Sequence, residues 1–249
     1  YARDGHGFVA LKKIKLPQDV IGQGGRRKRR ASLDHFLLSS FASELIMLKN
    51  LKHPNVVGYI GCTLYKGDAG EDQIAIVQEF APFGTLKPLI QEKNLMRRSF
   101  STADGLRWAH HVASGMAYLH RCKPAIIHRD LKPENVLLCG PRCTAKLADF
   151  GLMTFERAMG HGTGDTSGHP AVPAVGSNNT TKPTGMVGSM RYMGPENFRG
   201  EAYTHKTDVY SYGIILYELL TRLRAYGNIL YSTEQIAQEA AYRGMRPDL

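Results

Sequence analysis

The sequence predicts an α+β fold of two lobes, a small β-rich lobe followed by a larger helical lobe. In the first part of the chain, strand patterns surround a single amphipathic helix, whereas the long periodic segments further on are helical. A short Pro-Phe-Gly connector marks the change between the two parts. With 249 residues, of which 43% are apolar, the chain can bury a core in each lobe. We place the small lobe at residues 1–80, the hinge at 81–84 and the large lobe at 85–249.

The small lobe is predicted to follow the order strand, helix, strand, strand. Alternating and β-branched residues predict strands at 7–16, 56–60 and 74–80. Apolar residues recur at helical spacing between the first two, at Phe41, Leu45, Leu48 and Leu51. Pro54 is expected to end that helix, and the Gly-rich, basic stretch before it is expected to be an exposed loop.

The large lobe is predicted to contain two long helices and a pair of short strands. Ser101 and Asp104 resemble a capping box ahead of an apolar helical face, which continues to Leu119. Short strands are expected at 136–138 and 145–147. Residues 209–220 are apolar nearly all round, which predicts a helix buried at the centre of the lobe. Residues 152–187 are rich in Gly, Ser, Thr and Pro and predict an irregular segment.

The composition argues against several classes of protein. The net charge is +10, but half of this excess lies in the single basic run at 26–30, and no aromatic residues alternate with it. We therefore expect a solvated loop rather than a nucleic-acid-binding surface. No apolar run is long enough to span a bilayer, so we expect no membrane partner and a cytoplasmic or nuclear protein. Four scattered cysteines do not form a zinc motif.

Three short motifs carry the chemistry. A strand-like VALK ends in Lys12, HRDLKPENVLL runs from 128 to 138, and ADFG runs from 148 to 151. In this order, and with a helical Glu between the first two, they resemble the signature set of the protein-kinase family. MRYMGPE at 190–196 and DVYSYGIILYELL at 208–220 resemble two further family segments, so the resemblance covers essentially the whole chain.

The resemblance implies binding of ATP with Mg²⁺. Lys12 is suited to bracket the α- and β-phosphates, and it needs an anion to hold it in place. Glu44 is the best candidate because it lies on the inner side of the amphipathic helix, whereas its rivals Glu71 and Glu79 do not lie on that helix. Asn135 and Asp149 offer the hard oxygen ligands that Mg²⁺ prefers.

The remaining expected roles belong to catalysis and to adenine binding. Asp130 should orient the substrate hydroxyl and accept its proton, and Lys132 should stabilise the transferring phosphate. By resemblance, five further residues form the adenine pocket: Ala10 and Leu137 sandwich the ring, the hinge backbone of Glu79 and Ala81 bonds it, and Gln78 guards the pocket behind.

Serine/threonine specificity is predicted from two features. Lys132 lies in a DLKPEN context, and Ser189 occupies the place of a hydroxyl that bonds the catalytic Asp and Lys in such kinases. The stretch TGMVGSMRYMGPE resembles the tyrosine-kinase-like (Raf-like) branch. One alternative is a pseudokinase scaffold that binds nucleotide or partners without turnover, although the residues it usually loses are all present. Another is a basic nucleic-acid module built on 26–30.

Protein substrates are the implied partners, together with an upstream kinase. The activation segment is expected at 149–196, with Thr184 as its first phosphorylation candidate and Arg129 as the partner of the phosphate. Ser32, in RRASL, is a second candidate site. The family's Gly-rich loop lies before the VALK strand, and further helices normally follow RGMRPDL. We therefore expect this chain to be a fragment, truncated at both ends.

Overall fold

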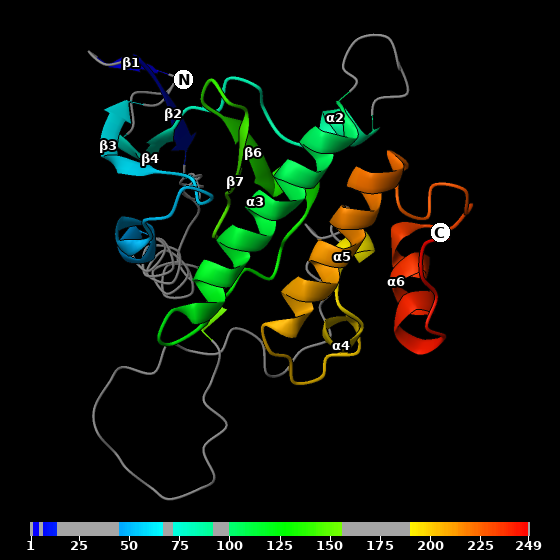
Figure 1. Cartoon of the computed structure of the whole chain (residues 1–249). Helices are drawn as coiled ribbons and strands as arrows, with labels where there is room; N and C mark the ends of the chain where they lie inside the picture. Colours follow the sequence, from blue (N-terminus) through cyan, green and yellow to red (C-terminus); the bar gives the residue numbers. More distant parts are fainter. Residues whose placement is uncertain are drawn as a thin grey trace, which may run out of the picture.

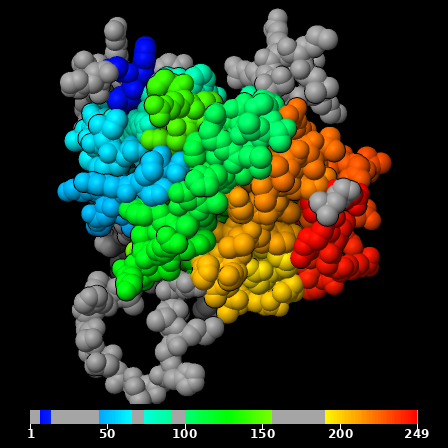
Figure 2. All heavy atoms as spheres, in the orientation of Figure 1, coloured from blue at the N-terminus to red at the C-terminus, as the bar shows by residue number. Residues whose placement is uncertain are grey.

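A mixed α+β fold of two lobes is seen in the computed structural model, which describes residues 2–4, 7–13, 45–66, 72–91, 100–155 and 190–248. The strands of the small lobe lie at one side of the molecule, and the helices of the large lobe fill the other (Figure 1). In the space-filling view, the α3 residues lie between the small lobe and the α5 and α6 residues (Figure 2). The predicted fold class is confirmed. The predicted lobe boundaries stay a prediction.

An antiparallel sheet in the order β1-β2-β4-β3 forms the small lobe. Its strands are β1 (Ala2–Asp4), β2 (Gly7–Lys13), β3 (Tyr59–Lys66) and β4 (Asp72–Glu79). In the β2–β4 register, Ala10 lies opposite Gln78 and Lys12 opposite Ile76. Because side chains alternate along a strand, Ala10 and Lys12 share one face of the sheet.

The strand predicted at 56–60 is wrong in its position. The observed β3 begins at Tyr59 and continues to Lys66. Val56 and Val57 are β-branched and apolar, as in a strand, but they pack into the core instead, with 2% and 1% of their surface exposed. The Val57 N–H donates to Leu147 O at 2.9 Å, which ties this segment to the large lobe.

The predicted helix before Pro54 is described at residues 45–50. Leu48 and Leu51 point into the core, with 1% and 7% of their surface exposed, as the apolar spacing predicts. Leu48, Val56 and Phe150 belong to one continuous apolar cluster, which therefore joins the two lobes.

The long helix α3 (Thr102–Arg121) starts at the predicted capping box. Asp104 N–H donates to Ser101 Oγ at 3.1 Å, and the carboxylate of Asp104 accepts from Ser101 N–H at 3.1 Å. Such reciprocal bonds satisfy two N–H groups that a helix start leaves without partners. Among the residues that the structure describes, no helix is both long enough and apolar enough to cross a membrane.

Helix α5 (Lys206–Thr221) packs beside α3 (Figure 1). Ile214, Ile215 and Leu219 are buried, but Val209 and Leu220 are each 48% exposed. The expectation of a helix buried all round is thus too strong, because one edge of α5 remains uncovered by described residues. Shorter helices complete the lobe: α2 (Lys87–Gln91), α4 (Pro195–Phe198) and α6 (Thr233–Tyr242), none of which was predicted from the sequence.

Two small antiparallel strand pairs each have a strand in contact with α3. The hairpin of β6 (Val136–Cys139) and β7 (Thr144–Leu147) agrees with the predicted strands. The other pair is formed by β5 (Ile126–Ile127) and β8 (Thr154–Phe155). The loop from β5 to β6, with the 3-10 turn η1 (Pro133–Asn135), carries the HRDLKPEN motif, and β7 leads directly into ADFG.

Candidate active site

The loop between β5 and β6 is held in place by hydrogen bonds to one buried carboxylate. Asp208, fully buried at the start of α5, accepts from the backbone N–H of His128 at 2.8 Å and of Arg129 at 2.9 Å. His120 Nε2 lies 3.0 Å from the same carboxylate. Arg129 has a φ of 68°, a left-handed conformation that non-glycine residues avoid unless their surroundings enforce it. The hydrogen bonds to Asp208 supply that enforcement.

Asp130, Lys132 and Asn135 form a compact polar cluster on this loop. Lys132 Nζ lies 2.6 Å from Asp130 Oδ2, with 18% and 11% of the two side chains exposed. Asn135 Nδ2 donates to Asp130 Oδ2 at 3.0 Å and to Asp130 O at 2.7 Å. Because the amide nitrogen of Asn135 is used in this way, its Oδ1 is the atom that can bind a cation.

Lys12 and Asp149 face each other across the two lobes. Lys12 Nζ, on β2, lies 2.8 Å from Asp149 Oδ1, in the segment that follows β7. Burial alone would raise the pKa of Asp149, but the hydrogen bond and charge of Lys12 outweigh it, with help from His128 and the Gly151 N–H. The pKa of Asp149 therefore lies below its ordinary value, and the carboxylate is ionised near neutral pH.

The two halves of the site are joined through the backbone. The Ala148 N–H donates to Asn135 O at 2.9 Å, so Asp149 follows directly after a residue that is bonded to Asn135. His128 Nε2 lies 3.0 Å from Ala148 O, and the His128 ring is 5.3 Å from the ring of Phe150. These contacts bring the carboxylate of Asp149 and the amide of Asn135 to the same end of β7.

The predicted adenine pocket is made by β2, β4, the connector after β4, and β6. Gln78 is buried, with 8% of its surface exposed, rather than an exposed strand residue. The Glu79 N–H already donates to Gly58 O at 2.8 Å, and Ala81 O accepts from Gly84 N–H at 3.1 Å. Neither of these bonds uses the carbonyl of Glu79 or the N–H of Ala81, and hydrogen bonding of adenine by the backbone of these two residues stays a prediction. Leu137 lies on β6, where it bridges to Thr85.

Several predicted residues lie outside the described part of the chain. These are Glu44, Ser32, Thr184 and Ser189, so the roles expected of them stay predictions. The structure does show where the side chain of Glu79 goes: its Oε2 lies 2.6 Å from Lys146 Nζ on β7 and 3.2 Å from Gly58 N. The carboxylate of Glu79 therefore pairs with Lys146, in agreement with the prediction of Glu44 rather than Glu79 as the partner of Lys12.

Sequence reasoning missed Asp208 and Lys146 as supports of the site. Asp208 was noticed only as the first residue of a family segment, and a lone carboxylate ahead of an apolar helix was the signal available. A buried acid at that point needs donors, because an unpaired buried charge is costly. The donors come from residues some eighty positions earlier, and local patterns contain no information about such a contact.

The model of the protein kinase domain matches residues 2–245. The chain belongs to the protein kinase family. Three similar proteins are named as kinases. A probable serine/threonine-protein kinase of Arabidopsis thaliana, SIS8, is 34% identical over 100% of this chain. A Dictyostelium discoideum one, roco6, is 32% identical over 97% of it, and the Drosophila melanogaster mitogen-activated protein kinase kinase kinase 7 is 31% identical over 97%.

This kinase chain spans only a part of those relatives: 20% of the Arabidopsis protein, 10% of the Dictyostelium protein and 33% of the Drosophila protein. The relatives agree with the predicted tyrosine-kinase-like branch. ATP as substrate, usually with Mg²⁺, is typical of the family.

Proposed function

We propose that this chain is the catalytic domain of a protein serine/threonine kinase, which transfers the γ-phosphoryl group of Mg-ATP to hydroxyls of proteins. One observation carries the proposal: the Asp130–Lys132–Asn135 cluster and the Lys12–Asp149 pair meet at the same end of β7, where the Ala148 N–H donates to Asn135 O. Phosphoryl transfer needs such a convergence of a base, fixed positive charge and cation ligands.

Asp130 acts on the substrate hydroxyl. Its Oδ2 is held by Lys132 and Asn135, so Oδ1 is the oxygen that orients the hydroxyl and accepts its proton. Lys132, 2.6 Å from that carboxylate, lies where it can also neutralise charge on the transferring phosphate. A preorganised ammonium in a partly buried site stabilises developing charge more than an exposed one does.

The residues present fit a magnesium site. Asn135 Oδ1 and the ionised carboxylate of Asp149 are hard oxygen donors, which Mg²⁺ prefers. The bound ion would neutralise phosphate charge. Lys12 holds Asp149 in place until nucleotide arrives, and its ammonium is then positioned for the α- and β-phosphates. Ala10, Gln78, Leu137 and the hinge groups of Glu79 and Ala81 would hold the adenine ring.

Preference for Ser and Thr is supported by Lys132 in its DLKPEN context and by the relatives, which are named as serine/threonine-protein kinases. A partner kinase acting at Thr184 is also proposed. Arg129 is exposed on the described surface, with its guanidinium 5.4 Å from the Tyr203 ring, so it can be reached by a phosphate. In the full-length protein, Thr184→Ala should lower activity, and Arg129→Ala should abolish the gain on phosphorylation.

The test uses the full-length gene product and its Asp130→Asn variant. Purified proteins are incubated with labelled ATP and with Ser-, Thr- or Tyr-containing peptide pools, with and without Mg²⁺. We expect the unchanged protein to label the Ser and Thr pools in the presence of Mg²⁺. The rate of labelling by the Asp130→Asn variant should be lower by roughly a hundredfold or more. Nucleotide-induced thermal stabilisation without any turnover would favour the pseudokinase alternative. Labelling that the variant retains would refute the role of Asp130.

A further inference from the structure

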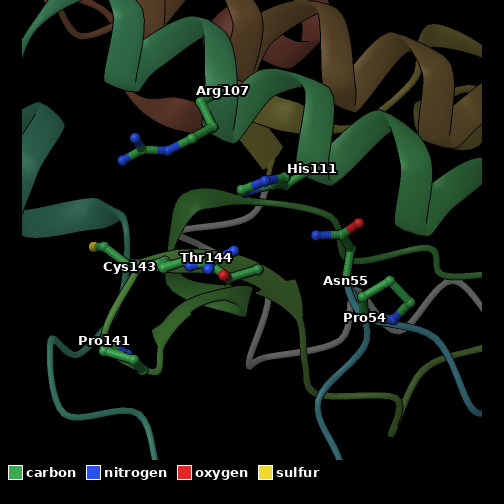
Figure 3. A pocket seen from close by; sticks show the side chains of 8 residues that line it. Pro54, Asn55, Arg107, His111, Pro141, Cys143 and Thr144 are labelled. Carbon is green, nitrogen blue, oxygen red and sulfur yellow. The ribbon is translucent and has the colours of Figure 1, made fainter.

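A concave surface lies apart from the site described above. It is a groove between α3 and the turn of the β6–β7 hairpin, with a volume of about 780 Å³ (Figure 3). Pro54 lines it from the segment ahead of β3, Arg107 and His111 line it from α3, and Arg142 and Thr144 from the hairpin. Ligand sites commonly fall between ~300 and ~1,000 Å³. No residue proposed for catalysis or nucleotide binding lines it.

The floor of the groove is held rigidly. Trp108 Nε1, on α3, donates to Cys143 O at 2.8 Å, and Asn55 Nδ2 donates to Ala145 O at 3.1 Å. Trp108, Asn55 and Ala145 are all buried. These bonds join α3, β7 and the segment before β3, so the groove is formed before any ligand arrives. Preformed sites lose less conformational entropy on binding.

The charged side chains that line the groove are all basic. Arg107 is 46% exposed, and within the described part of the chain its guanidinium contacts an acid only through Nη2, which lies 2.7 Å from Asp104 Oδ1. Arg142 is exposed in the hairpin turn and has no acidic partner among the residues that the structure describes. A concave surface lined by charges of one sign attracts ligands of the other sign.

His111 adds a hydrogen-bond donor. Its Nδ1 accepts from the Ala145 N–H at 3.2 Å. Burial lowers the pKa of His111, and the charges of Arg107 and His110 lower it further, so the ring is neutral at pH 7. A neutral ring that accepts at Nδ1 carries its proton at Nε2. Figure 3 shows this ring above the strand that carries Thr144, within the groove.

We propose that this groove docks an extended acidic peptide segment of a partner protein. Its carboxylates would bind the guanidinium groups of Arg107 and Arg142, and a backbone carbonyl would accept from His111 Nε2–H. Aliphatic side chains of the peptide would pack on Pro54 and Pro141, which form the apolar part of the lining. Charge complementarity is what selects this occupant over an apolar or a basic segment.

Docking here leaves the active site accessible. The groove is at the Thr144 end of β7, whereas Asp149 follows the opposite end of the same strand. A partner held in the groove would therefore be tethered to the molecule while another part of it reaches the catalytic loop, which raises its effective concentration there. The binding itself does not depend on the proposed kinase activity.

The test measures binding of a fluorescein-labelled peptide, EDLEDLED, by fluorescence anisotropy. The double variant Arg107→Gln/Arg142→Gln is compared with Arg121→Gln/Arg243→Gln, which removes the same charge from exposed positions elsewhere. A third variant replaces the five basic residues at 26–30 by Gln. We expect the dissociation constant to rise roughly tenfold or more in the groove variant only, because each charge-assisted contact is lost there.

The other outcomes overturn the proposal. An equal loss in the Arg121/Arg243 variant would mean general attraction to a basic chain, and a loss in the 26–30 variant would place the site on that run. No saturable binding by the unchanged protein, or a dimer that the groove variant abolishes, would also refute it.

Arg142→Glu, at an exposed turn, serves as a second variant should Arg107→Gln disturb the start of α3. Bound peptide should also slow alkylation of Cys143, which lines the groove.

Discussion

The buried carboxylate of Asp208 and the backbone N–H of Arg129 are 2.9 Å apart, although 79 positions separate them in the chain. Through this bond, the start of α5 determines the backbone conformation of the residue before Asp130. Arg129 holds a φ of 68°, and Asp208 is the group that stabilises it. The placement of the proposed base therefore depends on a residue outside the catalytic loop.

Replacing Asp208 by Asn should weaken both the fold and the reaction. An amide has one acceptor oxygen, so it cannot serve His128 N–H, Arg129 N–H and His120 together, and one buried donor is left unpaired. We expect a loss of about 1–3 kcal/mol in the free energy of unfolding. In the full-length protein, kcat should fall by roughly tenfold to a hundredfold, because small misplacements of a catalytic group are costly. Urea unfolding and steady-state kinetics measure the two effects.

Asp248→Asn is the matched control for that experiment. Asp248 is exposed and contacts only Asn228 Nδ2, at 2.9 Å, among the described residues. The Asp248→Asn substitution should change the free energy of unfolding by no more than about 0.5 kcal/mol, and kcat should stay close to that of the unchanged protein. Equal kcat values for the Asp208 variant and the unchanged protein would show that Arg129 keeps its conformation without this carboxylate.

The Glu79–Lys146 pair should couple the end of β4 to β7. Its atoms are 2.6 Å apart, with 30% and 18% of the side chains exposed, so it is better shielded from water than a surface pair. A double-mutant cycle with Glu79→Gln and Lys146→Met should give a coupling free energy of about 0.5–3 kcal/mol in urea unfolding. The exposed pair Arg243–Glu239, with 78% of the arginine side chain exposed, should give a coupling below ~0.5 kcal/mol in the same experiment. Equal coupling in the two cycles would contradict this argument.

Glu218 predicts a change of stability with pH. Burial raises the pKa of this carboxyl to about 7, against 4.5 for a free glutamate, although bonds from Ala225 N–H and Tyr192 and the charges of Arg191 and Arg224 act the other way. Between these two values, the unfolded chain has lost the proton while the folded chain keeps it. The free energy of unfolding therefore falls as pH rises through that window, by up to roughly 3 kcal/mol.

Glu218→Gln removes this titration while keeping an acceptor for Ala225 N–H, which bonds Glu218 Oε1 at 3.0 Å. We compare the free energy of unfolding of the variant with that of the unchanged protein. This difference should favour the variant more at about pH 8 than at about pH 5, by roughly 2–3 kcal/mol. Urea unfolding at both pH values gives the difference, with Glu239→Gln on α6 as the control. A difference that does not depend on pH would mean that Glu218 is ionised throughout this range.

Local signals in the sequence predicted the elements that depend on local contacts. The start of α3 follows from Ser101 and Asp104, and the short strands predicted at 136–138 and 145–147 agree with β6 and β7. Helix α6 had an equivalent signal that sequence reasoning overlooked: Ser232 and Gln235 form a capping box of the same kind. The strand predicted at Val56 and Val57 is wrong because β-branched residues suit both a strand and a buried irregular segment, and the two are distinguished by the contact with Leu147.

The motif residues of the candidate site could be chosen from the sequence, but their geometry could not. Order along the chain selects Lys12, Asp130 and Asp149, yet it gives no distance between β2 and the segment after β7. The amide orientation of Asn135 likewise depends on two contacts with Asp130. Contacts such as Lys146 with Glu79 connect residues 67 positions apart, and a hydrophobic pattern does not encode them.

Two glycines at the centres of the long helices should respond in opposite ways to the same substitution. On α3, a Cβ at Gly115 would lie 2.7 Å from Asn55 O and 2.9 Å from Leu147 Cδ1, whereas at Gly213 on α5 no atom lies within 4 Å. The leucine tip can rotate, but the carbonyl of Asn55 is backbone and must shift. Gly115→Ala should therefore destabilise by about 1–2 kcal/mol, because overpacking exceeds the gain in helix propensity. Gly213→Ala gains helix propensity without overpacking, so it should stabilise the protein by about 0.5–1 kcal/mol. Urea unfolding of both variants measures the two signs, and a Gly115→Ala protein at least as stable as Gly213→Ala would show that α3 does not pack this closely on the segment before β3.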